Sequence, residues 1–116
     1  MKTFKIKSEH NVYVDSFTEG EGDAVNSYNI SDEIKATNVK EAIEKYFQSY
    51  LYYAFDFSLA EVDEGILNYS VLVDENSNEV SENQIELWKK NEVELYANRI
   101  TITVYELTSV DLDKEL

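Results

Sequence analysis

Alternation of hydrophobic and polar side chains is clearest near the two ends of the chain. Residues 2–7 place Phe4 and Ile6 on one side and lysines on the other, and residues 99–107 alternate Ile, Ile and Val with Thr, Thr and Tyr. A two-residue period is typical of a half-buried strand. Residues 66–73 alternate in the same way, so all three segments are predicted strands. The β-branched content of residues 99–107 makes that strand the clearest of the three.

Weaker strand signals follow in the first third of the chain. Residues 8–11 have the composition of a turn, which predicts that His10, the only histidine, is exposed to solvent. Residues 12–17 are rich in β-branched and aromatic residues and are predicted to form a second strand. Residues 18–26 hold two of the three glycines and three acids, which is typical of a loop. Residues 27–34 are interpreted as either a short strand or an extended crossing.

A long amphipathic helix is predicted to begin after Asn38. Asn38 can cap the helix, Glu41 stands three residues on as its reciprocal partner, and Glu41 and Lys45 have the spacing of an ion pair. Apolar residues then recur at three- and four-residue steps, which predicts a wide stripe facing the core. The stripe consists of Val39, Ala42, Ile43, Tyr46, Phe47, Tyr50, Leu51 and Ala54. Tyr52 and Tyr53 are interpreted as rim residues or, alternatively, as a partner-binding patch.

The segment DENSNEVSENQIE, residues 74–86, begins like a calcium-binding loop. Positions 1, 3 and 5 of the EF-hand pattern carry oxygen-bearing side chains, namely Asp74, Asn76 and Asn78. Position 6, which requires glycine, is Glu79, and position 12, which requires a bidentate glutamate, is Ile85. These two departures argue against specific calcium binding, and no metal is predicted.

A turn and a capped helix account for the same segment without a metal. The residues after the apolar run are turn formers, and Ser81 can cap a short helix with Gln84 as its reciprocal partner. This helix is predicted to end near residue 90. Trp88, the only tryptophan, is predicted to pack on the sheet.

Together these elements predict a single α+β domain over residues 1–116, with residues 108–116 as a frayed tail. The expected order is β-β-α-β-α-β. It gives a mainly antiparallel sheet of four to five strands, with one long and one short helix on one face. Residues 56–65 are interpreted either as a ragged edge strand or as a loop that tucks apolar side chains under the domain. A ferredoxin-like arrangement is one of the strand orders that fit.

Composition narrows the classes of function. The chain has 116 residues, no cysteine and a single histidine, which excludes disulfides and thiol nucleophiles and leaves little for a histidine-based triad. No phosphate-binding loop, dinucleotide fingerprint or zinc-ligand spacing is present in the sequence, so we expect a protein that is not an enzyme and has no cofactor. Neither a signal-like N-terminus nor a long apolar run is present, which favours a cytoplasmic protein.

Charge is the strongest signal in the composition. The chain has 24 acidic and 10 basic residues, a formal net charge of −14 and a pI near 4.3, so nucleic acid and anionic membranes are poor partners. Residues 46–88 contain no Lys or Arg. The predicted partner-binding residues lie in this span: Asp56, Glu61, Asp63, Glu64, Asp74, Glu75, Glu79, Glu82 and Glu86, with Tyr52 and Tyr53. A carboxylate array can imitate the phosphates of duplex DNA.

In size, acidity and lack of catalytic motifs, the chain resembles the small inhibitors that phages and mobile elements make against restriction or CRISPR nucleases. The resemblance implies a non-enzymatic inhibitor that acts in a bacterial cell by binding a basic nucleic-acid-handling protein, as a DNA mimic does. Lys2, Lys5 and Lys7 depart from a uniformly acidic mimic. The alternative is a small adaptor or homo-oligomerising domain whose acidity only keeps it soluble. A calcium-dependent module is the third hypothesis.

Overall fold

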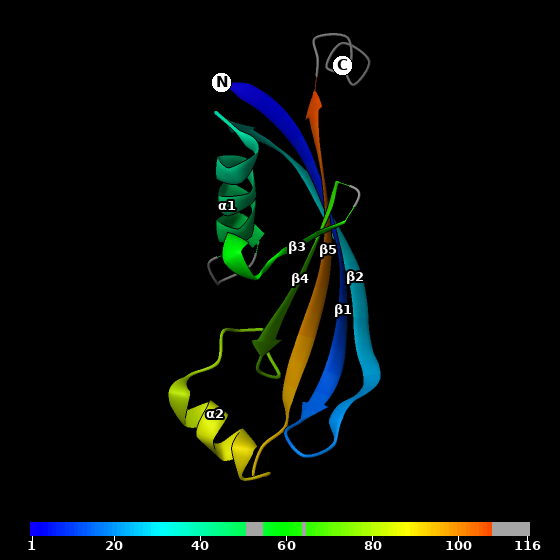
Figure 1. Cartoon of the computed structure of the whole chain (residues 1–116), viewed down its shortest axis with the longest axis vertical. Helices are drawn as coiled ribbons and strands as arrows, with labels where there is room; N and C mark the ends of the chain where they lie inside the picture. Colours follow the sequence, from blue (N-terminus) through cyan, green and yellow to red (C-terminus); the bar gives the residue numbers. More distant parts are fainter. Residues whose placement is uncertain (51–54, 64, 108–116) are drawn as a thin grey trace.

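The computed structural model describes residues 1–50, 55–63 and 65–107. Five strands form one antiparallel sheet in the order β2-β1-β5-β4-β3, and two α-helices lie beside it (Figure 1). The elements are β1 (Lys2–Ser16), β2 (Gly20–Ala36), α1 (Val39–Tyr50), the 3-10 helix η1 (Phe57–Leu59), β3 (Glu61–Asp63), β4 (Ile66–Val73), α2 (Glu82–Lys89) and β5 (Leu95–Leu107). The molecule is elongated, with extents of 54 × 24 × 24 Å. The predicted α+β class and strand number are confirmed, and the element order matches the prediction except that the short strand β3 precedes β4.

β1 is a single long strand, so the prediction of a turn at residues 8–11 is wrong. These residues lie in the middle of β1, where His10 is paired with Tyr28 of β2 on one side and with Ile100 of β5 on the other. His10 is 1% exposed, not solvated. Pairing on both edges satisfies the backbone groups of these polar residues, and that tertiary gain outweighs their turn propensity.

β1 and β2 together form one long hairpin. The predicted strand at residues 12–17 lies in the second half of β1 up to Ser16, and most of the predicted loop at residues 18–26 belongs to β2. The turn itself is confined to residues 17–19, and Gly20 follows it with a φ of +76°. Irregular register near Tyr13 accommodates the glycine-rich start of β2 in the ladder. Residues 27–34 form the middle of β2, as the strand interpretation predicted.

The predicted start of α1 is confirmed. The side-chain Oδ1 of Asn38 accepts a hydrogen bond of 2.8 Å from the backbone N–H of Glu41, and Lys45 Nζ lies 3.0 Å from a Glu41 carboxylate oxygen. The other Glu41 oxygen accepts a 2.6 Å bond from the Thr37 hydroxyl, so this carboxylate binds Thr37 and Lys45. Hydrogen bonds from Thr37 and Lys45 hold the pKa of Glu41 below its ordinary value.

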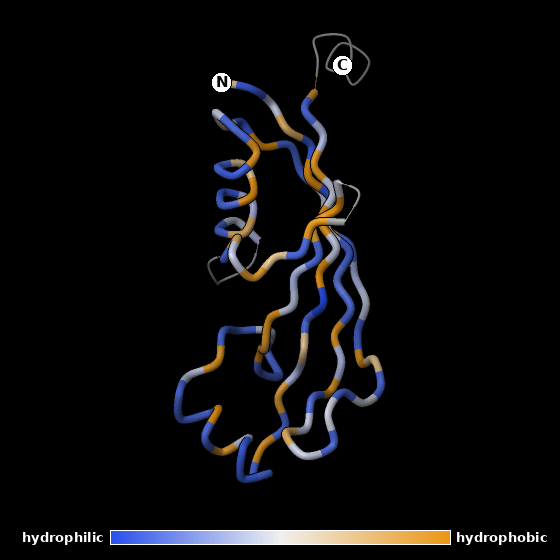
Figure 2. The backbone as a smooth tube through the Cα atoms, viewed as in Figure 1, coloured by the Kyte–Doolittle hydropathy of each residue, from blue (hydrophilic) through white to orange (hydrophobic). Residues whose placement is uncertain are grey.

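α1 packs on one face of the sheet, over β1 and β2, and supplies four of the twelve buried residues of the core cluster. Figure 2 shows hydrophobic positions of α1 turned toward the strands. Its buried residues are Ala42, Ile43, Tyr46 and Phe47, all 0% exposed. Phe47 meets Phe55 with ring centroids 4.7 Å apart and Tyr69 at 6.2 Å. Val39 and Tyr50 lie at the margin of the stripe, 46% and 38% exposed, while residues 51–54 lie outside the described residues.

Residues 56–65 confirm the edge-strand interpretation. η1 leads into the three-residue strand β3, which pairs with the start of β4. Leu59 and Val62 are 65% and 71% exposed, whereas Phe57 and Ala60 pack against the core cluster. β1 and β2 are joined by a short turn and not by a helix, and the strand order is β2-β1-β5-β4-β3, so the ferredoxin-like arrangement is wrong.

α2 begins with the predicted capping box. The Ser81 hydroxyl accepts from the Gln84 N–H at 3.2 Å, and the Gln84 side-chain oxygen accepts from the Ser81 N–H at 2.7 Å. The helix lies beside one end of the sheet (Figure 1). Trp88 is half-buried there, with its indole N–H donating to the backbone oxygen of Asp15 at 2.7 Å and its ring against Phe17. The tryptophan therefore packs at the end of the sheet, beside the β1–β2 turn.

Candidate functional site: an acidic end

The fold sorts charged residues along the long axis of the molecule. We define the acidic end as residues 13–26 and 71–99, which the strand register places together: Asp15 is paired with Glu21 of β2 and with Leu95 of β5. This end contains eleven Asp or Glu residues and three Lys or Arg residues, a formal charge of −8. The other described residues, here the mixed end, contain nine acidic and six basic residues. The uncompensated charge is thus concentrated at one end.

Antiparallel pairing explains why the lysines gather at the mixed end. The first residues of β1 are paired with the last residues of β2, so Lys2 lies opposite Ala36. The basic cluster at residues 2–7 therefore lies next to the one at residues 35–45, although about 30 positions separate them in the sequence. Lys2, Lys5 and Lys7 therefore do not offset the negative charge of the acidic end.

The acids predicted to bind a partner are distributed over two places. Asp56 caps η1 and Glu61 and Asp63 lie in β3, at the mixed end. The other described members of the set, Asp74, Glu75, Glu79, Glu82 and Glu86, lie at the acidic end, in and around the β4–α2 turn and on α2. Glu64, Tyr52 and Tyr53 lie outside the described residues.

The separation between the two places follows from β4. Glu61 is paired with Asn68, and six residues of extended chain from there to Asp74 span about 20 Å. The Debye length at physiological salt is about 8 Å, so the two groups act as separate electrostatic surfaces. Residues 56–86 are continuous in sequence but do not form one continuous acidic surface.

Six acids of the acidic end lie outside the predicted set. They are Asp15, Glu19, Glu21, Asp23, Glu92 and Glu94. The first four belong to the β1–β2 hairpin and its turn, and the last two lie between α2 and β5. The signal that could have found them is the hairpin itself, because two paired strands bring the acids flanking their turn to one tip.

Two ion pairs lie within the described residues of the acidic end: Lys89 Nζ lies 4.0 Å from Glu86 Oε1 on α2, and Arg99 pairs with Glu21. The Arg99 guanidinium binds Glu21 with two contacts, Nη2 to Oε2 at 2.6 Å and Nε to Oε1 at 3.1 Å, which raises the pKa of Arg99. Asp15 lies nearby, and burial followed by the Glu21 charge raises the pKa of its carboxyl, with Arg99 opposing the shift. Arg99 is therefore already neutralised by a local partner and offsets little of the remaining negative charge.

Asp74 forms the turn predicted in place of a calcium loop. One carboxylate oxygen accepts from the backbone N–H groups of Asn76 at 2.9 Å and Asn78 at 3.0 Å, and Ser77 adopts a φ of 63°. The bond from Asn78 contributes most to holding the pKa of Asp74 below its ordinary value. Over the part of the chain that the structure describes, no three His, Cys, Asp or Glu side chains are grouped as a metal site would require.

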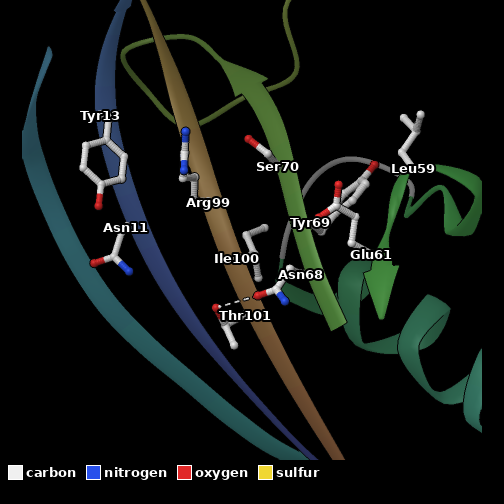
Figure 3. A pocket seen from close by; sticks show the side chains of 10 residues that line it. All are labelled: Asn11, Tyr13, Leu59, Glu61, Asn68, Tyr69, Ser70, Arg99, Ile100 and Thr101. Atoms are coloured by element: carbon white, nitrogen blue, oxygen red, sulfur yellow. Dashed lines mark hydrogen bonds between the residues drawn. The ribbon is translucent and has the colours of Figure 1, made fainter. Parts of the chain in front are cut away.

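An open concavity of about 640 Å³ lies on the sheet between β1, β5, β4 and the η1–β3 segment (Figure 3). Its lining residues are Asn11, Tyr13, Leu59, Glu61, Asn68, Tyr69, Ser70, Arg99, Ile100 and Thr101. The Thr101 hydroxyl donates to Asn68 Oδ1 at 3.3 Å, and Arg99 is held by Glu21. Amide and hydroxyl groups dominate its polar lining, so the concavity can hydrogen-bond a polar group without offering it a strong net charge.

A buried polar network lies beneath α1. Ser8 Oγ is 2.6 Å from His10 Nε2 and 2.6 Å from the Tyr46 hydroxyl, which donates to the Ile30 carbonyl at 3.0 Å. The donors are satisfied if His10 Nε2–H donates to Ser8, and Ser8 to Tyr46. The Ser8–His10 distance is that of a nucleophile and its base, but both residues are 1% exposed, so a substrate has no route to Ser8.

Comparison of the chain with known protein families, characterised proteins and solved structures found no match. In the described ranges, neither α-helix has the length and apolar character needed to cross a bilayer. The fold and its charge distribution are therefore the observations from which a function can be argued.

Proposed function

We propose that the protein is a non-enzymatic inhibitor that binds a basic nucleic-acid-handling protein, such as a nuclease or a CRISPR effector, through its acidic end. The observation that carries this proposal is the concentration of eleven acidic against three basic residues in one half of an elongated molecule. A compact, strongly anionic end attracts a Lys- and Arg-lined channel and repels nucleic acid and anionic lipid.

The charge density of the acidic end is about half that of duplex DNA, the ligand that a Lys- and Arg-lined channel normally binds. Half of the 54 Å long axis is about 27 Å, over which duplex DNA carries about 16 phosphate charges. The acidic end carries a formal charge of −8 over that length, roughly half the value for DNA. This density supports partial mimicry of a duplex, with the remaining affinity supplied by other contacts.

The test compares two triple variants with equal changes in charge. Inhibition of DNA cleavage is measured for a panel of restriction endonucleases and for a guide-loaded CRISPR effector nuclease. The acidic-end variant is E19K/D23K/E75K, and the mixed-end control is E9K/E61K/E106K. All six side chains are exposed, and circular dichroism checks that each variant keeps its fold.

We expect the wild-type chain and the mixed-end control to inhibit at least one enzyme of the panel, with inhibition weakening as salt rises. The acidic-end variant should lose most of that inhibition. Equal loss in both variants would mean that net charge alone matters, and it would reject the acidic end as the binding surface. If the wild-type chain inhibits no enzyme of the panel, the proposal is wrong.

A second candidate function is an adaptor or self-assembling domain. The observation that favours it is the position of β2, a 17-residue strand at the edge of the sheet whose outer side has no neighbouring strand among the described residues. Such an edge can add a strand from another chain. Analytical ultracentrifugation decides this: a dimer that persists at low and high salt favours the adaptor, and a monomer at all concentrations excludes self-assembly.

A further inference from the structure

An exposed aromatic side chain lies at the tip of the β1–β2 hairpin. Phe17 directly follows β1, in the turn at residues 17–19, and is 50% exposed. Acidic residues flank it on both sides in the chain, with Asp15 before it and Glu19 after it. A large apolar side chain surrounded by charge is the arrangement found at the centre of many protein interfaces, where a ring of polar contacts excludes water from an aromatic residue.

Neighbouring side chains hold Phe17 in place. Its ring meets the Trp88 ring edge-on, with centroids 5.1 Å apart and planes at 72°. The indole N–H of Trp88 is fixed in turn by the 2.7 Å bond to the Asp15 carbonyl, and the Thr18 hydroxyl donates to Asn91 Oδ1 at 3.4 Å. The turn is thus tied to α2 through Trp88 and to Asn91, two residues beyond the end of that helix. An aromatic ring that is already oriented loses little entropy on binding.

We infer that Phe17 is the apolar anchor of the acidic end and inserts into an apolar pocket bordered by Lys and Arg on the partner protein. This inference rests on the proposed function. The charge around Phe17 selects a basic protein as the occupant, because nucleic acid, anionic membrane and a second copy of this chain, at a net charge of −14, are all repelled. Burial of the ring supplies the part of the affinity that salt does not screen.

The test separates the contribution of the ring from that of the charges. The variant is Phe17→Ala, and the matched control is Tyr105→Ala, which removes another 50% exposed aromatic at the mixed end. Binding to the same restriction endonucleases and guide-loaded CRISPR effector is measured by surface-immobilised kinetics at two salt concentrations. We expect F17A to bind about tenfold or more weakly, mainly through faster dissociation and with an unchanged salt dependence, and Y105A to differ by less than about twofold.

The single tryptophan gives a second readout. Incorporation of 5-fluorotryptophan places one ¹⁹F nucleus at Trp88, against the Phe17 ring, and its resonance should shift when an inhibited enzyme is added. If the wild-type chain binds an enzyme of the panel but F17A binds equally well, or the resonance does not move, the anchor is rejected and the proposed function stands. If the wild-type chain binds no enzyme of the panel, both fail.

Discussion

Acidification should destabilise the protein through the single histidine. His10 is buried between the elements that pack around it: Tyr28 of β2 stacks on its ring with centroids 4.5 Å apart, and Ser8 and Tyr46 share its hydrogen-bonded network. Burial lowers the pKa of His10 to about 4, with the Asn98 side chain opposing part of the shift. The side chains that contact the imidazole, Tyr28, Ser8 and Asn98, include no carboxylate that would stabilise its charged form.

The magnitude follows from the difference between the two states. The imidazole has a pKa of 6.5 in the unfolded chain and about 4 in the folded chain. At 1.36 kcal/mol per pKa unit, this gap corresponds to up to about 3 kcal/mol. Because the unfolded state binds the proton first, the stabilisation is fully present above pH 6.5 and is lost progressively as the pH falls toward 4.

A comparison with His10→Asn isolates this effect from the carboxylates, which titrate in the same range. The free energy of unfolding is measured by urea denaturation between pH 7.5 and 4 for both proteins. The advantage of the wild-type chain over H10N should shrink by up to about 3 kcal/mol across that range. An advantage that stays constant with pH, or an imidazole NMR titration with a midpoint near 6.5 in the folded protein, would refute the reasoning.

Three further outcomes are expected. Ser81→Ala removes one half of the α2 capping box and should lower the free energy of unfolding by about 1 kcal/mol in urea denaturation, whereas Ser81→Asp, which can also cap, should not. Phe47→Ala empties a fully buried aromatic site and should cost about 3–5 kcal/mol in the same assay; a loss under 1 kcal/mol would contradict the packing beneath α1. Millimolar calcium should leave the melting temperature unchanged relative to magnesium, since one Asp74 oxygen already binds two backbone N–H groups; a calcium-specific rise would restore the calcium-loop hypothesis.

Local sequence signals were sufficient where structure depends on neighbouring residues. The Asn38 cap, the Glu41–Lys45 ion pair and the Ser81 capping box each involve residues three or four positions apart, and all three are present. The alternation in residues 66–73 and 99–107 also predicted β4 and the larger part of β5, because both strands have one face toward the core.

Local signals failed where long-range pairing decides the conformation. Residues 8–11 are polar, yet β2 and β5 pair with them on both sides, and the buried network under α1 satisfies Ser8 and His10. No pattern within the segment itself shows that its side chains will be covered by a helix about 38 residues away in sequence. The glycines of residues 18–26 similarly suggested a loop, because the sequence does not show that a partner strand accommodates the irregular register.

The candidate site could be predicted only in part for the same reason. The base-free span drew attention to the acids at residues 74–86, which the structure places at the acidic end. The span also included Asp56 and Glu61, which lie at the mixed end, separated from Asp74 by about 20 Å along β4. It did not include the acids of the β1–β2 hairpin. A run of charge in sequence becomes a surface only through the register of the strands that carry it.

The uneven charge also gives the molecule an electric dipole along its long axis. In the field of a positively charged surface, a dipole of this kind experiences a torque that turns the acidic end toward the surface before contact. Met1, 86% exposed, directly precedes β1 at the opposite end of the 54 Å axis. A fluorophore or fusion attached at the N-terminus should therefore point away from whatever the acidic end meets, and report on the encounter without obstructing it.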